Sequence, residues 1–328
     1  MTLAESVSYD TAFNTAGFAV SSRGLVAYRA GGLEARQLQW FDRNGKPLVV
    51  ALMPDVNTLV CAELSPNGRQ VAVTRTIQGN TDVWLIDILR GGMTRFTVDT
   101  AVDQLPIWSP DGTQIAFSSN RKGIYDLYLK LASGAGGEEL LLESPQTKIV
   151  EDWSADGKFV LYQEGGSKTG WDLWALPTGG DRKPVAVVNS AFEERDGQFS
   201  PDARWVAYES NVSGRFEIYV QPFPSPGGKW QVSTAGGTFP RWRADGKELF
   251  FIAPNAKLMS VPVNTSGATF EAGSPAALFQ TRIVSGGIAA LQTQYAVSRD
   301  GRFLINTQVE ESDTTPITLI LNWKPPKQ

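Results

Sequence analysis

The sequence of 328 residues contains no histidine. A Ser-His-Asp or Cys-His nucleophile site needs an imidazole to carry the proton, so the chain cannot build a peptidase or esterase site of that kind by itself. Metal sites that depend on histidine ligands are excluded for the same reason. Any catalytic site would have to be built from carboxylates, Tyr, Lys or Arg.

Cysteine pairs, long apolar runs and an excess of basic charge are also missing. The single Cys61 cannot form a disulfide within the chain, and its apolar surroundings indicate a small buried side chain rather than a reactive thiol. No stretch approaches 18 apolar residues and the N-terminus has no basic or apolar leader, so we expect no membrane span and no export signal in this sequence. With 30 basic and 34 acidic residues intermixed, nucleic acid is not an expected partner.

The sequence is instead rich in one repeated phrase. An aromatic or aliphatic residue precedes Ser-Pro-Asp-Gly or a close relative, and a short apolar run follows. The steps between copies, 43 to 55 residues, match the length of a four-stranded β-blade. The sequence therefore predicts one all-β domain over residues 1–328, a closed β-propeller. The final Gly position of the phrase falls at Gly24, Gly68, Gly112, Gly157, Ala203, Gly246 and Gly301.

The repeated phrase has the chemistry of a tight turn. In Ser109-Pro110-Asp111-Gly112, proline presets φ, the Ser and Asp side chains can bond to nearby backbone N–H groups, and glycine accepts a positive φ. We expect an inner strand before this turn and a second strand after it. A third strand then opens with an acidic residue, such as Asp82, Asp172 or Glu217, which we expect to accept hydrogen bonds from a loop rather than to bind a ligand.

Seven copies predict seven blades of four antiparallel strands each. The last copy lacks an outer strand, and the segment from Glu5 to Tyr9 has no partner of its own. We expect this segment to pair beside the strand from Ile317 to Leu321 and to close the ring, because an open ring would expose two strand edges. The degraded first copy and the final step of 55 residues leave six blades with an appended hairpin as the alternative.

The Ser-Pro-Asp-Gly copies, each followed by an apolar strand and an (Asp/Glu)-x-(Trp/Tyr) strand, resemble the WD-like repeat of TolB-type β-propellers. Finer phrases are similar to the C-terminal propeller of many bacterial serine/threonine protein kinases, namely Leu38-Gln39-Trp40-Phe41-Asp42-Arg43-Asn44-Gly45-Lys46, Asp181-Arg182-Lys183-Pro184 and Val220-Gln221-Pro222-Phe223-Pro224. That resemblance implies a sensor or docking domain. It also implies an extracytoplasmic or periplasmic location, since the kinase lies across a membrane from the propeller.

Charged residues gather in the segments that lead into the inner strands and in the loops between second and third strands. Both kinds of loop are expected on one face of the ring, around the mouth of its channel, whereas the opposite face consists of turns explained by backbone geometry. We expect Glu194 and Arg195 near the centre of the binding face. A solvated polar rim that includes Lys148 and Arg241 is the simpler structural interpretation. The candidate ligand- or partner-binding residues are Asp103, Arg121, Glu151, Asp152, Glu193, Glu194, Arg195, Asp196 and Arg215, with Gln104, Lys122 and Lys168 beside them.

These observations favour a non-catalytic, monomeric module that binds a protein, peptide or glycan at the channel mouth without a cofactor. A carbohydrate-active enzyme is one alternative, because a glycosidase needs only two suitably spaced carboxylates. A TolB-like periplasmic adaptor is another. Glu193, Glu194 and Asp196 offer the oxygen ligands that Ca²⁺ prefers, but their spacing does not define a shell of six to eight ligands.

Overall fold

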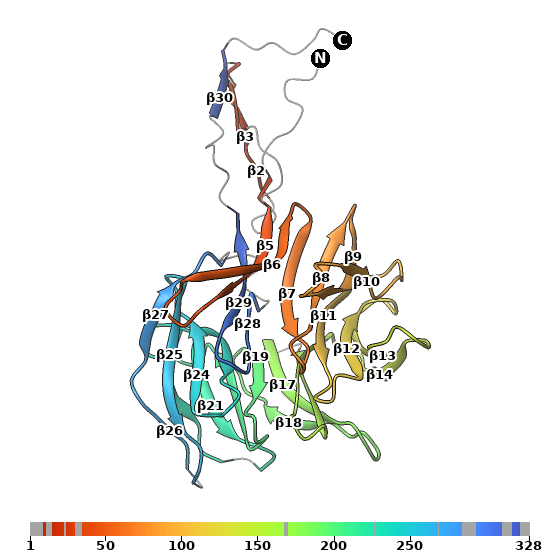
Figure 1. Cartoon of the computed structure of the whole chain (residues 1–328), viewed down its shortest axis with the longest axis vertical. Coiled ribbons are helices and arrows are strands. Elements are labelled where there is room, and N and C mark those ends of the chain that lie inside the picture. Colours follow the sequence, from red (N-terminus) through yellow and green to blue (C-terminus); the bar gives the residue numbers. More distant parts are fainter. Residues whose placement is uncertain are drawn as a thin grey trace.

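The computed structural model describes residues 9–10, 15–22, 24–29, 35–166, 170–225, 227–267, 269–283, 293–309 and 317–321. Every helix or strand assigned within these ranges is a β-strand, as expected for an all-β chain (Figure 1). No helix in this part of the chain could cross a membrane.

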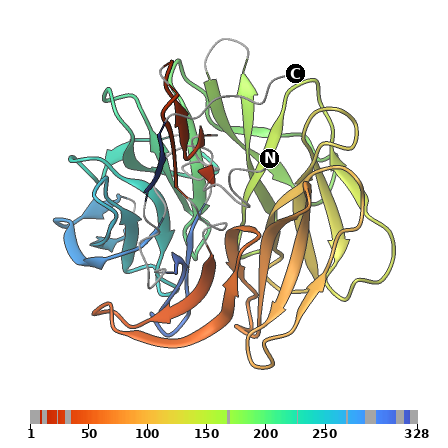
Figure 2. The ribbon, with the colours of Figure 1, turned by 90° about the horizontal axis from the view of Figure 1, so that it is seen from above.

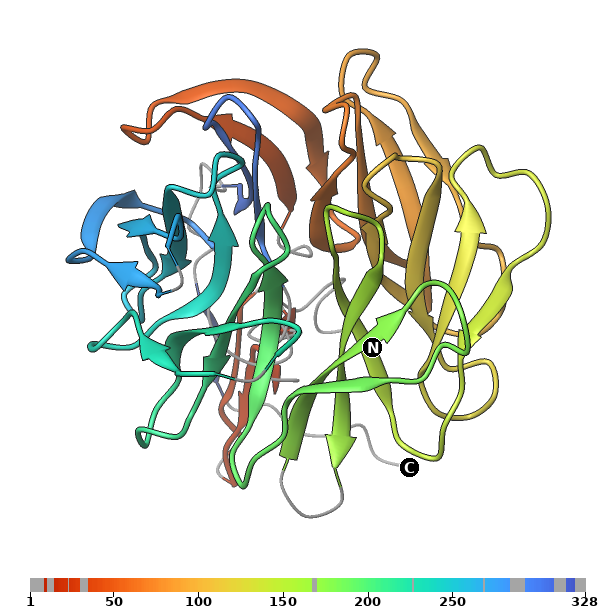
Figure 3. The ribbon, with the colours of Figure 1, turned by 90° about the horizontal axis from the view of Figure 1, so that it is seen from below.

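Six antiparallel sheets stand around a common axis (Figures 2 and 3). Blade 1 contains β7 (Thr58–Leu64), β8 (Gln70–Ile77), β9 (Asn80–Asp87) and β10 (Met93–Arg95). Blade 2 contains β11 (Asp103–Trp108), β12 (Gln114–Ser119), β13 (Asp126–Leu131) and β14 (Glu139–Leu142). Blade 3 contains β15 (Lys148–Trp153), β16 (Phe159–Gly166), β17 (Gly170–Pro177) and β18 (Val185–Val188).

The other half of the ring follows the same plan. Blade 4 contains β19 (Glu194–Phe199), β20 (Trp205–Ser210), β21 (Glu217–Pro222) and β22 (Trp230–Gln231). Blade 5 contains β23 (Thr238–Trp242), β24 (Glu248–Ile252), β25 (Lys257–Asn264) and β27 (Ala276–Gln280), with the short β26 (Glu271–Ala272) also paired to β25. Blade 6 contains β28 (Tyr295–Val297), β29 (Phe303–Gln308), β5 (Arg36–Phe41) and β6 (Pro47–Asp55).

The ring closes in blade 6, where strands from both ends of the sequence share one sheet. β29 pairs with β5 in a continuous register from Phe303↔Phe41 to Gln308↔Arg36. The described residues thus form a ring of six blades, and the prediction of seven is wrong for them. The reason is that the inner strands of the last repeat join the outer strands of the first, so that two repeats supply one blade.

The remaining strands of those two repeats form a separate sheet that stands beyond the ring (Figure 1). The turn that begins at Ser21 joins β3 (Phe18–Val20) to β4 (Val26–Arg29), and β30 (Ile317–Ile320) pairs with β4. The strand at Ile317 therefore pairs with the first repeat. Its pairing with the segment from Glu5 to Tyr9 stays a prediction. Residues 5–8 lie outside the described ranges, and β1 (Tyr9–Asp10) pairs with β2 (Thr15–Ala16).

The repeated turns have the expected chemistry. Ser109 Oγ donates to Asp111 Oδ1 at 2.6 Å and accepts from the Gln114 amide at 2.9 Å, while Gly112 takes φ of 71°. The same Ser–Asp bond recurs at Ser154, Ser200 and Ser298. These side chains are used by the turn itself, which fixes where each inner strand ends.

The aromatic residue before the turn joins neighbouring blades. The indole of Trp108 donates to the carbonyl of Glu63 at 3.0 Å, and that of Trp242 donates to the carbonyl of Gln198 at 3.2 Å. Six clusters of buried apolar side chains each combine residues of two adjacent blades, including one between blades 6 and 1. Buried apolar side chains therefore join every pair of adjacent blades. Polar side chains gather in the channel.

Candidate binding site in the central channel

Irregularities in five inner strands define the middle of the channel. A register shift interrupts the pairing of β7, β11, β15, β19 and β23 with their second strands. At four of these bulges a residue other than glycine takes a positive φ, namely Cys61, Leu105, Asp196 and Phe239. A bulge redirects a side chain that regular alternation would point elsewhere, at a conformational cost. We call the level of these bulges the channel waist.

A small cavity of about 20 Å³ lies at the waist. Its walls come from blades 1 to 5 and from the segment before β28. One side is apolar and the other is polar. The lining residues are Leu105, Pro106, Ile107, Ile149 and Val150 on the apolar side, and Cys61, Glu63, Glu151, Asp196, Arg241 and Thr293 on the polar side.

Arg241 supplies the positive charge at the waist. Its Nη2 lies 3.0 Å from Glu63 Oε1 and donates to Thr293 Oγ1 at 2.8 Å, while Nη1 donates to the carbonyl of Pro240. The guanidinium therefore pairs with Glu63, and among the described residues no ion pair joins it to Asp196 or Glu151.

Asp196 and Glu209 form a buried pair of carboxyl groups beside the cavity. Arg195 Nε donates to Glu209, but Oδ2 of Asp196 and Oε2 of Glu209 find no donor among the described residues. Burial, and then the charge of Asp196, raises the pKa of Glu209 well above its usual range. Burial also raises the pKa of Asp196.

Glu151 and Asp152 follow each other on β15 and have different surroundings. Burial, and then the charge of Asp196, raises the pKa of Glu151 well above its usual range. Asp152 Oδ2 accepts from the Phe199 amide at 2.8 Å, which joins blade 3 to blade 4. Burial nevertheless raises the pKa of Asp152 to about 7. Glu151 therefore belongs to the cavity, and Asp152 belongs to the contact between blades.

Cys61 is buried at the waist, as the sequence indicated. Burial raises the pKa of its thiol well above the usual value, and the neighbouring carboxylates Glu63 and Asp196 raise it further. Because the thiolate is the nucleophilic form, this thiol is unreactive at neutral pH.

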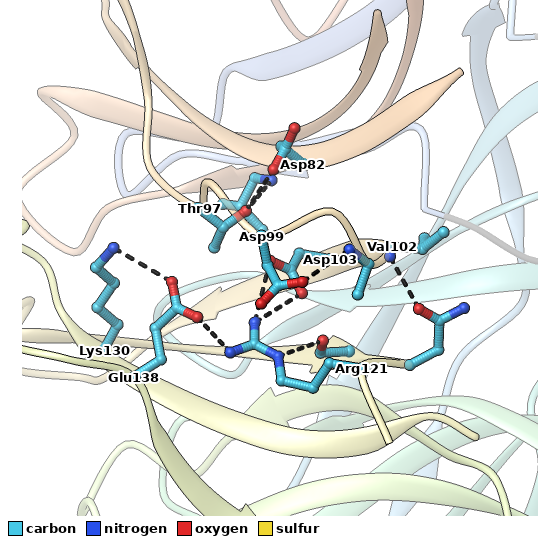
Figure 4. A network of polar contacts seen from close by, with 12 residues as sticks. Asp82, Thr97, Asp99, Val102, Asp103, Arg121, Lys130 and Glu138 are labelled. Atoms are coloured by element: carbon cyan, nitrogen blue, oxygen red, sulfur yellow. Dashed lines mark hydrogen bonds and ion pairs between the residues drawn. The ribbon is translucent and has the colours of Figure 1, made fainter. Parts of the chain in front are cut away.

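Asp103 and Arg121 lie in a network inside blade 2 rather than at the waist (Figure 4). Arg121 Nη2 contacts Asp103 Oδ1 at 3.0 Å, Nη1 donates to Glu138, and Nε donates to Ser119 Oγ at 2.9 Å. The guanidinium also lies 4.3 Å from the ring centre of Tyr128. Asp103 is fully buried, so these two residues join the inner, middle and outer strands of one blade instead of facing a partner.

The residues predicted at the centre of the binding face are also buried, within blade 4. Glu194 accepts from Ser190 Oγ at 2.8 Å and Ser210 Oγ at 3.0 Å, and burial raises the pKa of its carboxyl. Arg195 lies 3.9 Å from the ring centre of Phe216. Charge reversal at either position would therefore disturb the blade itself.

The remaining candidates lie toward the surface. Glu193 is partly exposed, and Arg215 is largely exposed and pairs with Glu217 at 2.8 Å. Lys168 lies outside the described residues. Of the predicted set, the structure thus brings Glu151, Asp196 and Arg195 together around the waist.

The acidic residues that open the third strands have the expected role. Asp82 accepts from Thr97 Oγ1 at 3.3 Å, Asp172 accepts from the Ser190 amide at 3.1 Å, and Glu217 accepts from the Gly236 amide at 2.9 Å. Each donor belongs to the segment that leads toward the next blade. These carboxylates therefore hold connecting loops in place.

Sequence reasoning missed Glu63, Glu209 and Thr293 and assigned Arg241 to a solvated rim. The repeat itself points to Glu63 and Arg241. Both lie two residues before the residue that begins the turn, which is Ser in most copies. That position holds Glu63, Ile107, Asp152, Gln198, Arg241 and Ala296 in successive ring repeats. Four polar residues at one position of the inner strands indicate a polar layer across the channel.

A larger cavity of about 330 Å³ lies between blades 5 and 6. Phe41, Phe279 and Thr307 are among its lining residues. In the described part of the chain, no group of three or more Asp, Glu or Cys side chains is arranged to hold a metal ion, and this includes Glu193, Glu194 and Asp196.

The fold and this channel define the class of protein as a β-propeller with an internal polar site. The family model described as the TolB beta propeller domain matches residues 48–173. The structure of a putative TolB from Agrobacterium tumefaciens superposes with a TM-score of 0.67 at 18% identity, covering 85% of this chain and 100% of that one. TolB from Acinetobacter baumannii gives 0.58 at 12% identity, covering 76% and 68%. The chain therefore has a β-propeller fold similar to that of TolB, and its residues 48–173 match the model of the TolB propeller domain.

A curated relative carries the name of an enzyme. The protein called tricorn protease homolog 1 of Streptomyces coelicolor is 30% identical over 169 residues, which cover 47% of this chain. The same match spans only 15% of the Streptomyces protein. The likeness therefore concerns a small part of that protein.

Proposed function

We propose that this propeller is a non-catalytic module that binds a protein, peptide or glycan at the mouth of its central channel, with one small group of the ligand reaching the waist. The observation that carries the proposal is the convergence of five bulged inner strands on one cavity. A positive φ at a residue other than glycine lowers the stability of the fold. Its repetition at the waist is typical of a site that orients side chains for binding.

The chemistry of the waist supports binding without turnover. The chain has no histidine, and the one cysteine is buried with a raised pKa. A glycosidase would need room for a sugar ring between two carboxylates, whereas the cavity of about 20 Å³ is close to the size of one water molecule. The carboxyl groups of Asp196 and Glu209 contact each other, which leaves no space for a substrate bond between them.

The biological context of this binding is a sensor domain of a bacterial serine/threonine kinase. The support is the similarity of the phrase from Leu38 to Lys46, which covers most of β5 and the turn that leads to β6, to the propellers of such kinases. A gene that encodes a kinase and a membrane span upstream of this sequence would support this context. A free-standing gene with an export signal would favour a periplasmic adaptor instead.

The binding proposal is tested with panels of synthetic peptides and of bacterial and plant oligosaccharides. Binding is followed by the shift of the unfolding temperature, and the recovered compounds are analysed by mass spectrometry. We expect at least one compound to bind and to be recovered intact. Ile149→Phe, which enlarges a side chain in the cavity wall, should weaken that binding at least tenfold. Arg302→Gln, which removes a half-exposed arginine paired with Asp300, should not change it. Turnover by the wild type would overturn the proposal.

A further inference from the structure

The carboxyl groups that line the waist cavity outnumber its basic groups. Three carboxyl groups line it, those of Glu63, Glu151 and Asp196, against the single guanidinium of Arg241. That guanidinium pairs with Glu63. Asp196 is 5% exposed, and its Oδ2 accepts no hydrogen bond within the described residues. A buried carboxylate without a donor is unfavourable, so the cavity favours an occupant that brings both hydrogen and positive charge.

We propose that the waist binds a primary ammonium group, such as the end of a lysine side chain, through Asp196 and Glu151. This rests on the proposed function and names the chemistry of the ligand at the same site. The ammonium would donate to Oδ2 of Asp196 and to the Glu151 carboxylate. Because no metal-binding group is found among the described residues, a small organic cation fits the site better than a metal ion.

The size of the cavity selects among cations. A volume of about 20 Å³ suits a compact ammonium better than a planar guanidinium or imidazolium. The opposite wall consists of Leu105, Pro106, Ile107, Ile149 and Val150, which suits an unbranched chain of methylene groups. A lysine side chain has this combination of an apolar stem and a compact charged end.

Burial raises the pKa of Asp196, and burial together with the charge of Asp196 raises the pKa values of Glu151 and Glu209. The ammonium would take the place of a proton on these carboxyl groups. The charged groups that face this cluster are Glu63, Arg195 and Arg241. Binding of the ammonium releases a proton, so affinity increases with pH until the amine itself loses its charge.

The test is a titration of the folded chain with Nα-acetyl-lysine methylamide, with the norleucine analogue as the uncharged control. We expect the lysine compound to bind at least tenfold more tightly than both the norleucine and the arginine compounds. Its affinity should rise between pH 6 and pH 8, with proton release detected by calorimetry in buffers of different ionisation enthalpy. Equal binding of the three compounds would overturn the inference.

The variant Asp196→Asn keeps a side chain that tolerates the positive φ of 51° at this position and gives Glu209 an amide donor. It should remain folded and lose at least tenfold in affinity for the lysine compound. Glu143→Gln, an exposed carboxylate paired with Lys122, is the matched control and should bind as the wild type does. Stabilisation by Ca²⁺ with no response to lysine would identify a metal site instead. A peptide or glycan that binds independently of Asp196 would leave the proposed function intact and refute the ammonium site.

Discussion

Arg241 Nη2 lies 3.0 Å from Glu63 Oε1, which joins residues 178 positions apart in the sequence. The two residues belong to blades 5 and 1, and blade 6 lies between those blades in the ring. The same guanidinium nitrogen also holds Thr293, just before the inner strand of blade 6. The contact therefore joins three blades at the point where the ring closes, and it fixes one wall of the waist cavity.

Removing this guanidinium should destabilise the ring. Arg241→Leu leaves the carboxylate of Glu63 without its partner, and loss of one member of a buried pair costs about 3–5 kcal/mol. We expect the loss to be smaller at pH 5.5 than at pH 8, because protonation removes the unpaired charge of Glu63, whose pKa burial raises. Urea unfolding at the two pH values measures both effects. Equal losses at the two values would contradict this explanation, and Arg302→Leu serves as the exposed control.

The stability of the wild-type chain should decrease as pH rises from about 5 to 8. Burial raises the folded-state pKa of Asp152 to about 7, and it also raises the pKa values of Glu151 and Asp196. At pH values between the unfolded-state pKa near 4 and the folded-state pKa, the folded state binds more protons than the unfolded state. The free energy of unfolding therefore decreases as the pH rises through this range. Asp152→Asn should flatten this dependence in chemical denaturation. Stability that rises over the same range would show that the waist carboxyls are not protonated in the fold.

The turns should determine the acid limit of stability. Hydrogen bonds from Ser109 lower the pKa of Asp111 in the folded state, so its contribution is complete above pH 4 and is lost as the pH falls further. Asp111→Asn should reduce the loss of stability on acidification and leave the region above pH 5 unchanged. An unaltered acid limb of the denaturation profile would argue against this role.

Ala203 is expected to be a local weakness of the ring. It has a φ of 54° at the position where other repeats place glycine, such as Gly157 with a φ of 75°. For a residue with a Cβ, this conformation costs about 1 kcal/mol of stability. Ala203→Gly should therefore raise the free energy of unfolding, and Gly157→Ala should lower it by a similar amount. Urea unfolding of the two variants measures both changes. If the free energy of unfolding changed in the same direction in both variants, the strain at Ala203 would be contradicted.

The sequence predicts the repeated elements well because turn chemistry is local. The Ser109–Asp111 bond and the positive φ of Gly112 follow from residue types alone. The pairing of β29 with β5 depends on strands more than 250 positions apart, which no periodic pattern specifies, so the number of blades was misjudged. Glu151 and Asp196 were recognised as channel residues by their charge. Glu63 was missed, and Arg195 was placed on the surface, because bulges alter the direction of side chains without changing the repeat.

Closure through blade 6 can be tested with a disulfide. Thr307 and Gln37 are paired across β29 and β5, so Gln37→Cys with Thr307→Cys should form a disulfide and raise the unfolding temperature under oxidising conditions. In a ring of seven blades β4 would lie beside β5 instead, and the control pair Tyr28→Cys with Gln39→Cys would then react. A disulfide in the control pair and none between positions 37 and 307 would contradict the closure.

The central claim, that the ligand binds at the channel waist, is tested most directly by a crystal structure with the tightest-binding compound from the peptide and oligosaccharide panels. We predict ligand density in the cavity bounded by Leu105, Ile149 and Asp196, with the compound intact. Density on the turns around Asp111 and Asp156, or on the sheet of β3, β4 and β30, with the waist unchanged would contradict the account.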